Sequence, residues 1–231
     1  MIGDKSVLAI IPARGGSKGI KRKNIKAIAG KPLIAWTIKE AQKSQYIDRI
    51  ILSSEDMEII NVAKSYGCEV PFTRPIELAQ DDTPGVLPVL HAIKKLKKYD
   101  YIVLLQPTSP LRKTIDIDYA IELLYKKNGV SCVSVTETDN SPYWMYYIDQ
   151  EHNMKSIITD GDIPMRRQAA PKVFSLNGAI YVSDSDYLMK TKSLITDETL
   201  AYIMPYERSI DIDTEMDFLL CDLLLTRLQN E

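Results

Sequence analysis

Apolar and polar positions alternate along most of the chain in a way that predicts strands and helices in turn. Short apolar runs bounded by polar residues or glycine are typical of buried strands, and longer stretches with one apolar side are typical of helices. The predicted strands are Val7–Ile11, Arg49–Ser53, Cys68–Phe72, Tyr101–Leu105 and Val130–Thr136. The predicted helices are Lys31–Ser44, Asp56–Tyr66, one between Val86 and Lys98, and Thr114–Lys127. This order favours an α/β fold with a mainly parallel sheet and helices on both faces.

The alternation stops between Asp139 and Val173, where turn pairs and four aromatic residues replace any long helical pattern. We predict a β-rich insertion, 139–173, within a single domain that spans 1–231. Exposed aromatic side chains there would suit a subunit contact, and packing beneath the insertion itself explains them equally well. The alternation then resumes with Gly178–Ser183, Leu200–Met204, Ser209–Asp213 and a last helix from about Thr214 to Leu228.

Composition narrows the class of protein. The 231 residues are 45% hydrophobic and 26% charged, with a net charge of −2, so one ordinary globular core is expected. Neither charge sign dominates, which argues against binding to duplex nucleic acid or to an anionic membrane. No stretch approaches the roughly 18–20 apolar residues of a membrane span. The three cysteines are far apart and form no Cys-x-x-Cys pair, as expected of buried residues in a cytoplasmic protein.

A glycine-rich basic loop follows the first predicted strand. Its glycines let the backbone turn sharply, and consecutive N–H groups in such a turn form an anion-binding concavity. Ligands of open α/β sheets bind at the carboxyl ends of strands, where this loop begins. The loop suits a triphosphate, although a solvated basic turn would have the same composition; it matches neither the P-loop nor the dinucleotide motif. Its glycines and cations are Arg14, Gly15, Gly16, Lys18, Gly19, Lys21, Arg22 and Lys23.

A second polar loop, Gln106–Arg112, follows the strand Tyr101–Leu105, and its two prolines stiffen it. Gln106 offers a donor and an acceptor, and Arg112 can bind a carboxylate through two hydrogen bonds. We therefore expect both residues at a substrate. A rigid connection between strand and helix is the alternative.

Two carboxylates, Asp211 and Asp213, stand two residues apart in the predicted strand Ser209–Asp213. Such residues face the same side of a strand, so both side chains could point into one site. Mg²⁺ shared with nucleotide phosphates would relieve their repulsion. The alternative is that Asp213 caps the last helix and Asp211 is exposed.

Arg166 and Arg167 lie near the end of the insertion. Two interpretations are open: they reach a substrate carboxylate, including one bound across a subunit interface, or they are ordinary surface charges. No Gly-x-Ser-x-Gly elbow or Cys/His pairing indicates covalent catalysis.

Five segments, in order along nearly the whole chain, carry a resemblance to a known family. They are Ile11–Gly19 with Lys23-Asn24, Arg74–Leu78, Gln106–Arg112, Arg167-Gln168 with Asn177–Tyr181, and Ser209–Glu215. The third and the fifth are the most specific. On these motifs the sequence resembles the acylneuraminate cytidylyltransferase family, the CMP-sialic acid synthetases.

The resemblance implies a Rossmann-like nucleotidyltransferase fold, Mg²⁺ dependence, and a homodimer built through the insertion. CTP and an acidic nine-carbon sugar would be the substrates. The nucleotide-binding residues would be Ala13, Arg14, Gly15, Gly16, Ser17, Lys18, Lys23, Asn24 and Arg74. The residues at the sugar would be Gln106, Tyr181 and, from the neighbouring subunit, Arg167. The catalytic residues would be Arg14, Lys23, Asp211 and Asp213, the last two as magnesium ligands.

The expected reaction transfers CMP from CTP to the anomeric hydroxyl of a nonulosonic acid and releases pyrophosphate. Gly15-Gly16 and Val70–Phe72 also resemble the branch that acts on legionaminic and pseudaminic acids, so the choice among these and N-acetylneuraminic acid is open. A cytidylyltransferase for 3-deoxy-manno-octulosonate and a non-catalytic nucleotide-binding module are the alternatives. The Gln106–Arg112 and Ser209–Glu215 segments argue against the first, and the intact catalytic set argues against the second.

Overall fold

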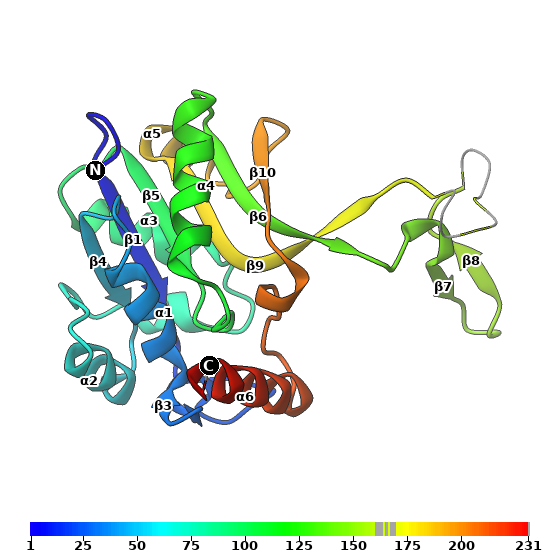
Figure 1. The fold of residues 1–231 in the computed structure, drawn as a ribbon, viewed down its shortest axis with the longest axis horizontal. Coiled ribbons are helices and arrows are strands. Elements are labelled where there is room, and N and C mark those ends of the chain that lie inside the picture. The colour runs from blue at the N-terminus through cyan, green and yellow to red at the C-terminus, as the bar shows by residue number, and fades with distance from the viewer. Residues whose placement is uncertain (160–163, 165, 167–169, 231) are drawn as a thin grey trace.

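A six-stranded sheet forms the centre of the body, in the order β10-β6-β9-β5-β1-β4 (Figure 1). The computed structural model describes residues 1–159, 164, 166 and 170–230. Neighbouring strands are parallel, except that β9 is antiparallel to β5 and β6. The predicted mainly parallel sheet is confirmed. Its strands are β1 (Val7–Pro12), β4 (Arg49–Ser53), β5 (Tyr101–Leu105), β6 (Ser131–Thr138), β9 (Val173–Asp184) and β10 (Thr199–Ile203).

Strand β1 shows how both faces of the sheet are buried. Val7, Ala9 and Ile11 belong to one apolar cluster, whereas Leu8 and Ile10 belong to another, because successive strand residues point to opposite faces. Helices therefore cover both faces, as predicted. The first cluster includes side chains of α1 (Leu33–Gln42), α2 (Met57–Ser65) and α4 (Thr114–Lys126); the second includes side chains of α3 (Val86–Lys95) and α5 (Ser185–Thr191).

A third, smaller apolar cluster joins the C-terminal helix α6 (Glu215–Asn230) to the short hairpin of β2 (Ala27–Ile28) and β3 (Lys31–Pro32). Ile28 and Phe218 are buried in it together with Ile212, which is 0% exposed. Burial of Ile212 anchors the backbone between the two aspartates of the predicted site.

Strand β9 is irregular where it passes this region. Its pairing with β6 shifts register between Val133 and Val135, and Gly178 has a φ of 69°, which glycine adopts readily. The adjacent Asn177 is buried; it accepts a hydrogen bond from Ser134 Oγ at 2.6 Å and donates one to Ser209 Oγ at 3.0 Å. The irregularity thus ties β6 and β9 to the segment that precedes Asp211.

Strands β6 and β9 continue out of the body into a projecting arm (Figure 1). The arm carries the 3₁₀ turn Pro142–Trp144 and a hairpin of β7 (Tyr146–Ile148) and β8 (Met154–Ser156). Several of its large apolar side chains are exposed to solvent. They include Tyr147, Ile148 and Met154, which are 67%, 59% and 62% exposed.

Three predicted elements differ from the structure. Cys68–Phe72 contributes only a single bridge, between Glu69 and Ile51. Ser209–Asp213 is irregular backbone rather than a strand, because the N–H groups of Asp213 and Thr214 bind the Asp217 carboxylate. Lys31–Pro32 forms β3, and α1 begins only at Leu33.

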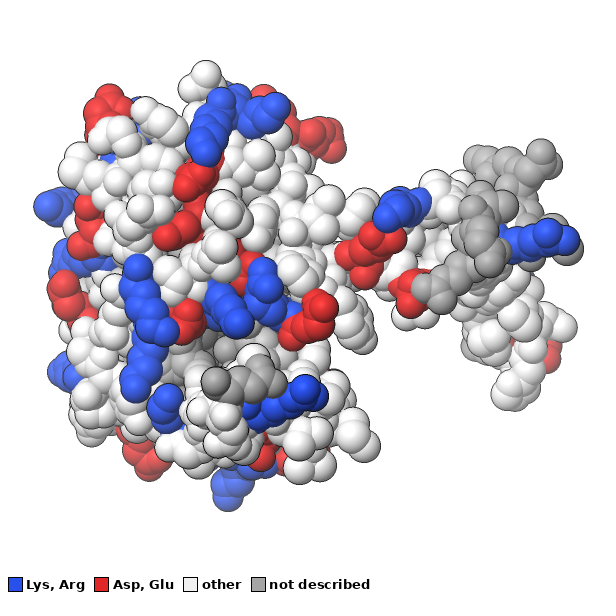
Figure 2. Space-filling view, viewed as in Figure 1, with Lys and Arg blue, Asp and Glu red and all other residues white. Residues whose placement is uncertain are grey.

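Charge is mixed over the surface. Figure 2 shows acidic and basic side chains interspersed on one face of the body, which agrees with the net charge of −2. Within the described part of the chain, no helix is long and apolar enough to cross a membrane.

Candidate active site

A cavity of about 570 Å³ lies at the carboxyl ends of β1 and β5, the position at which open α/β sheets bind ligands. It brings together most of the residues singled out from the sequence. Gly15, Gly16 and Arg112 are not among the residues that line it, and Arg167 lies outside the described residues. The predicted residues that line it are Ala13, Arg14, Ser17, Lys18, Lys23, Asn24, Arg74, Gln106, Tyr181, Asp211 and Asp213.

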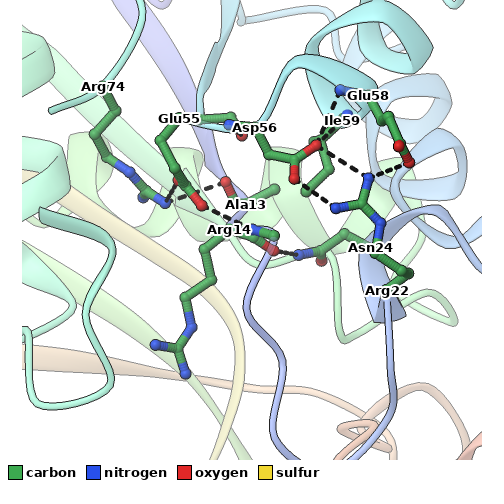
Figure 3. Close-up of polar contacts among 11 residues, drawn as sticks. Ala13, Arg14, Arg22, Asn24, Glu55, Asp56, Glu58, Ile59 and Arg74 are labelled. Atoms are coloured by element: carbon green, nitrogen blue, oxygen red, sulfur yellow. Dashed lines mark hydrogen bonds and ion pairs between the residues drawn. The ribbon is translucent and has the colours of Figure 1, made fainter. Parts of the chain in front are cut away.

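The glycine-rich loop is held in shape by side chains from outside it (Figure 3). Asn24 is buried, and its Nδ2 donates to the Arg14 carbonyl at 3.0 Å. The Gly15 N–H donates to Glu55 Oε1 at 2.8 Å. Gly15 N–H is therefore committed to the protein, and Ser17, Lys18 and Gly19 are the later loop residues that line the cavity.

Arg22 lies at the far end of the loop, and its side chain is bound by acidic residues of the protein rather than available to a ligand. It has a left-handed φ of 57°, and its guanidinium binds the carboxylates of Asp56 and Glu58 (Figure 3). Asp56 is also the N-cap of α2 and accepts from the N–H groups of Glu58 and Ile59. The ion pair with Arg22 lowers the pKa of Asp56. This cation therefore fastens the loop to α2.

Arg14 and Lys18 share one counterion, Asp81. Its carboxylate lies 2.8 Å from Arg14 Nη1 and 2.9 Å from Lys18 Nζ, and its side chain is 45% exposed. Hydrogen bonding to Lys18 is the main cause that lowers the pKa of Asp81. All three residues line the cavity, so an anionic ligand that binds these cations must compete with Asp81.

Asp211 and Asp213 line the same cavity in different surroundings. The Asp213 side chain is 78% exposed, and its Oδ1 is 3.3 Å from Lys23 Nζ, which also donates to the Ile212 carbonyl. Asp211 is partly buried, and its Oδ1 is buried without a hydrogen-bond partner among the described residues. Burial raises the pKa of Asp211; hydrogen bonding by the Thr108 side chain opposes the rise, and the nearby charge of Asp213 adds to it.

Two glycines allow the backbone to close around these carboxylates. A Cβ on Gly19 would lie 2.4 Å from the Asp213 carbonyl oxygen, so only glycine fits between the loop and this segment. A Cβ on Gly178 would lie 3.4 Å from Asp211 Oδ2, in a left-handed conformation that disfavours other residues. The glycine loop, the irregularity in β9 and the aspartate pair therefore meet at one point.

The position of Arg112 contradicts the predicted role of this residue in binding substrate. Arg112 is 1% exposed and buried beneath the Gln106–Arg112 loop, where its guanidinium donates to the carbonyls of Gln106 and Ala179 and to Thr37 Oγ1. Burial lowers its pKa to about 10, so it stays protonated at neutral pH. The residue closes the loop onto β9 and α1 and is not placed to bind a substrate carboxylate.

Uncharged groups extend the cavity beyond the basic loop. Gln106 and Tyr181 line it together with Thr108 and Leu194. Tyr181 lies on β9 beside Leu104 of β5, and burial raises the pKa of its phenol. The cavity thus combines cations, two carboxylates and neutral hydrogen-bonding groups, which suits a phosphorylated ligand beside a polyhydroxylated one.

Arg166 is not among the described residues that line this cavity. Arg166 is exposed, and Arg167 lies outside the described part of the chain. The predicted contact of Arg167 with a sugar carboxylate in a neighbouring subunit stays a prediction.

Sequence reasoning assigned no site role to Glu55 or Asp81. Glu55 lies two residues beyond the carboxyl end of β4, and this position is a signal that could have identified it. Asp81 stands in a loop whose contact with Arg14 and Lys18 joins distant parts of the chain, and no local pattern predicts such a contact.

Comparisons with known proteins agree with this geometry. A family model described as Cytidylyltransferase matches residues 8–210. The chain is 36% identical over 224 residues to the CMP-N,N'-diacetyllegionaminic acid synthase of Legionella pneumophila, and the aligned region covers 95% of this chain and 96% of that protein. It is 34% identical over 212 residues to the N-acylneuraminate cytidylyltransferase of Escherichia coli, and the aligned region covers 92% of this chain and 50% of that protein.

A solved structure of CMP:2-keto-3-deoxy-manno-octonic acid synthetase complexed with CTP has a TM-score of 0.74, with 98% of this chain and 100% of that chain covered. The two sequences are only 15% identical. The likeness therefore shows a shared nucleotidyltransferase fold and leaves the choice of sugar open.

Proposed function

The chain belongs to the cytidylyltransferase family, and we propose that it transfers CMP from CTP to the anomeric hydroxyl of a nonulosonic acid of the sialic-acid type, releasing pyrophosphate. One observation carries the proposal: a single cavity holds the basic glycine loop, Asp211, Gln106 and Tyr181 together. The two relatives described above are named for sugars of this type. The cytoplasm, where CTP is made, is the proposed location.

The proposed reaction is a direct in-line displacement. The sugar hydroxyl oxygen attacks the α-phosphorus of CTP, an O–P bond forms, and the hydroxyl proton is released to water. The bond from the α-phosphorus to the oxygen that bridges to the β-phosphate breaks, and pyrophosphate leaves. Such chemistry depends mainly on positioning and on charge neutralisation. Arg14, Lys18 and Lys23 supply positive charge at the cavity wall. They would hold the triphosphate and stabilise the charge that develops on the leaving group.

Magnesium is the proposed cofactor, and the residues present fit it. Asp211 offers a buried carboxylate oxygen with no partner among the described residues, and Asp213 lines the same cavity. The described residues contain no group of three or more metal-binding side chains. This agrees with Mg²⁺, which is commonly held by one or two carboxylates together with substrate phosphates and water. The ion would neutralise phosphate charge.

A homodimer is also part of the proposal. The exposed apolar side chains of the arm, among them Tyr147, Ile148 and Met154, would be covered by a second copy of the chain. Figure 2 shows uncharged surface on the described part of the arm with acidic and basic side chains beside it, and exposed apolar side chains are typical of an interface core. The insertion 139–173 would then bring Arg167 to the neighbouring subunit's cavity.

The test is pyrophosphate release with CTP and Mg²⁺ against four sugars: N-acetylneuraminic, legionaminic, pseudaminic and 3-deoxy-manno-octulosonic acid. We expect turnover with one or more of the three nine-carbon acids and little with the eight-carbon acid. Preference for the eight-carbon acid would replace the proposed substrate class. Tight CTP binding with no turnover on any sugar would favour a non-catalytic nucleotide-binding module.

A second expected result concerns Asp81. Asp81→Asn removes the anion that competes for Arg14 and Lys18, so the KM for CTP should fall by about threefold, the size typical of one exposed ion pair. Initial rates at varied CTP and at two salt concentrations measure it, because screening should shrink the difference. Asp82→Asn is the matched control and should leave the KM unchanged. A higher KM in Asp81→Asn would mean that Asp81 helps to hold the nucleotide.

A further inference from the structure

The root of the glycine loop, residues 13–15, is held by three side chains from three different segments (Figure 3). Arg74 Nη2 donates to the Ala13 carbonyl at 3.2 Å, and Asn24 Nδ2 donates to the Arg14 carbonyl at 3.0 Å. The Gly15 N–H donates to Glu55 Oε1 at 2.8 Å. Three consecutive residues therefore have a backbone group fixed before any ligand enters.

Glu55 is the one of these side chains that holds a second part of the cavity wall. Its Oε2 lies 2.6 Å from Arg74 Nη2, and the side chains of Arg74 and Glu55 are 3% and 14% exposed. Arg74 itself lines the cavity. A buried arginine and carboxylate need each other, because the loss of one leaves an uncompensated charge. The Glu55 carboxylate therefore positions both the Gly15 backbone at the root of the loop and the Arg74 guanidinium at the cavity.

The glycine loop packs closely against Glu55 and Asp56. A Cβ on Gly15 would lie 2.3 Å from Asp56 Oδ2, the neighbour of Glu55 in the connection from β4 to α2. The two acids thus occupy two donors of the loop, the Gly15 N–H and the Arg22 guanidinium. An anion cannot take the same position, since the carboxylates would repel it.

Four of the cations near the cavity consequently fall into two groups. Arg22 and Arg74 are neutralised by acids on or next to the β4–α2 connection. Arg14 and Lys18 are paired only with the exposed Asp81 in the ion pairs of the described residues. An exposed partner can be displaced at small free-energy cost. A triphosphate is therefore directed to Arg14 and Lys18 rather than to the loop root.

We propose that Glu55 is a positioning residue for CTP, which fixes the Gly15 peptide and the Arg74 guanidinium so that the later loop residues and Arg14 face the triphosphate. The proposal rests on the proposed function for the identity of the nucleotide. Glu55 does not touch the ligand; it acts through Gly15 and Arg74.

The test compares Glu55→Gln with the wild-type protein by calorimetric titration with CTP and Mg²⁺. Glutamine keeps an acceptor for Gly15 N–H but turns an NH₂ group toward Arg74, so the buried guanidinium loses its counterion. We expect the Kd for CTP to rise about tenfold or more. Glu69→Gln is the matched control: Glu69 also binds an arginine, Arg49, but at the surface, and its variant should bind CTP normally.

Steady-state rates separate positioning from a general loss of structure. In Glu55→Gln the KM for CTP should rise with the Kd, while the KM for the sugar stays within about twofold. The thermal midpoint should fall, because the buried Arg74 loses its counterion. If Glu55→Gln does not fold, Glu55→Asp, which keeps the charge but shortens the side chain, should show the same selective weakening of CTP binding. A normal Kd for CTP in a folded variant, or equal weakening of CTP and sugar, would overturn the proposal.

The calorimetric measurement needs no sugar, so the two proposals can fail separately. Wild-type protein that binds CTP but turns over no sugar would refute the proposed activity and leave the Glu55 comparison intact. Wild-type protein that does not bind CTP would refute both.

Discussion

Asp211→Asn is expected to lower pyrophosphate release by on the order of 10²–10³-fold, the loss typical of removing one charge-stabilising group from an active site. Asp211 lines the cavity, and its Oδ1 is buried without a partner among the described residues. Such an oxygen is free to bind a ligand or an ion. The neutral amide has the same shape but cannot balance the charge of a metal ion. Rates at saturating CTP and sugar measure the loss.

The stability of the same variant should move in the opposite direction. Burial raises the folded-state pKa of Asp211 above its ordinary value, so this group contributes stability only at low pH and loses it as pH rises through the folded pKa. At neutral pH the ionised carboxylate therefore destabilises the folded state. Asp211→Asn removes this destabilising charge, and the thermal midpoint of the variant should equal or exceed that of the wild type.

The pair of results excludes a trivial explanation. Asp186→Asn is the control, because Asp186 is 75% exposed and forms its ion pair with the surface residue Lys98. It should change neither activity nor stability. Activity near the wild-type level in Asp211→Asn would refute the assignment of Asp211, and lost activity with a lower thermal midpoint would point to misfolding instead.

Local pattern predicted the parts of the fold that local physics controls. The apolar runs of β1 and β5 are buried on both faces of the sheet, which is why an unbroken apolar run marked each strand correctly. The basic loop after β1 was predicted to lie at a ligand site, because strand ends in α/β sheets meet at one edge. The cavity found there contains Arg14, Lys23 and Asn24. Periodicity and topology were sufficient for these conclusions.

Long-range polar contacts were beyond the reach of the same reasoning. The structure replaces the predicted strand Ser209–Asp213 with irregular backbone, in which the Ile212 N–H binds the Thr108 carbonyl and the Asp213 N–H binds the Asp217 carboxylate. Glu55 and Asp81 acquire their roles from loop residues distant in sequence. The sequence names the side chains but not their partners, and whether an acid serves a ligand, a loop or a helix cap depends on those partners.

Arg112 allows the sequence-based role and the observed one to be tested against each other. The predicted substrate contact and the observed buried network lead to opposite expectations for the stability of an Arg112 variant. Arg112→Ala is expected to cost about 3–5 kcal/mol of the free energy of unfolding. It would leave the carbonyls of Gln106 and Ala179 and the hydroxyl of Thr37 without their buried donor and would open a cavity. Chemical denaturation monitored by circular dichroism measures the loss.

A residue that only gripped substrate would behave differently, because its removal would raise the KM for the sugar and leave stability within about 0.5 kcal/mol of the wild type. Arg49→Ala serves as the control: Arg49 binds Glu69 at the surface, and such pairs contribute about 0–1 kcal/mol. Arg112→Lys keeps the charge but cannot reach three acceptors with one ammonium group, so its stability should fall between the two. An Arg112→Ala protein as stable as Arg49→Ala would restore the substrate-binding role, because the buried network would then contribute nothing that the fold requires.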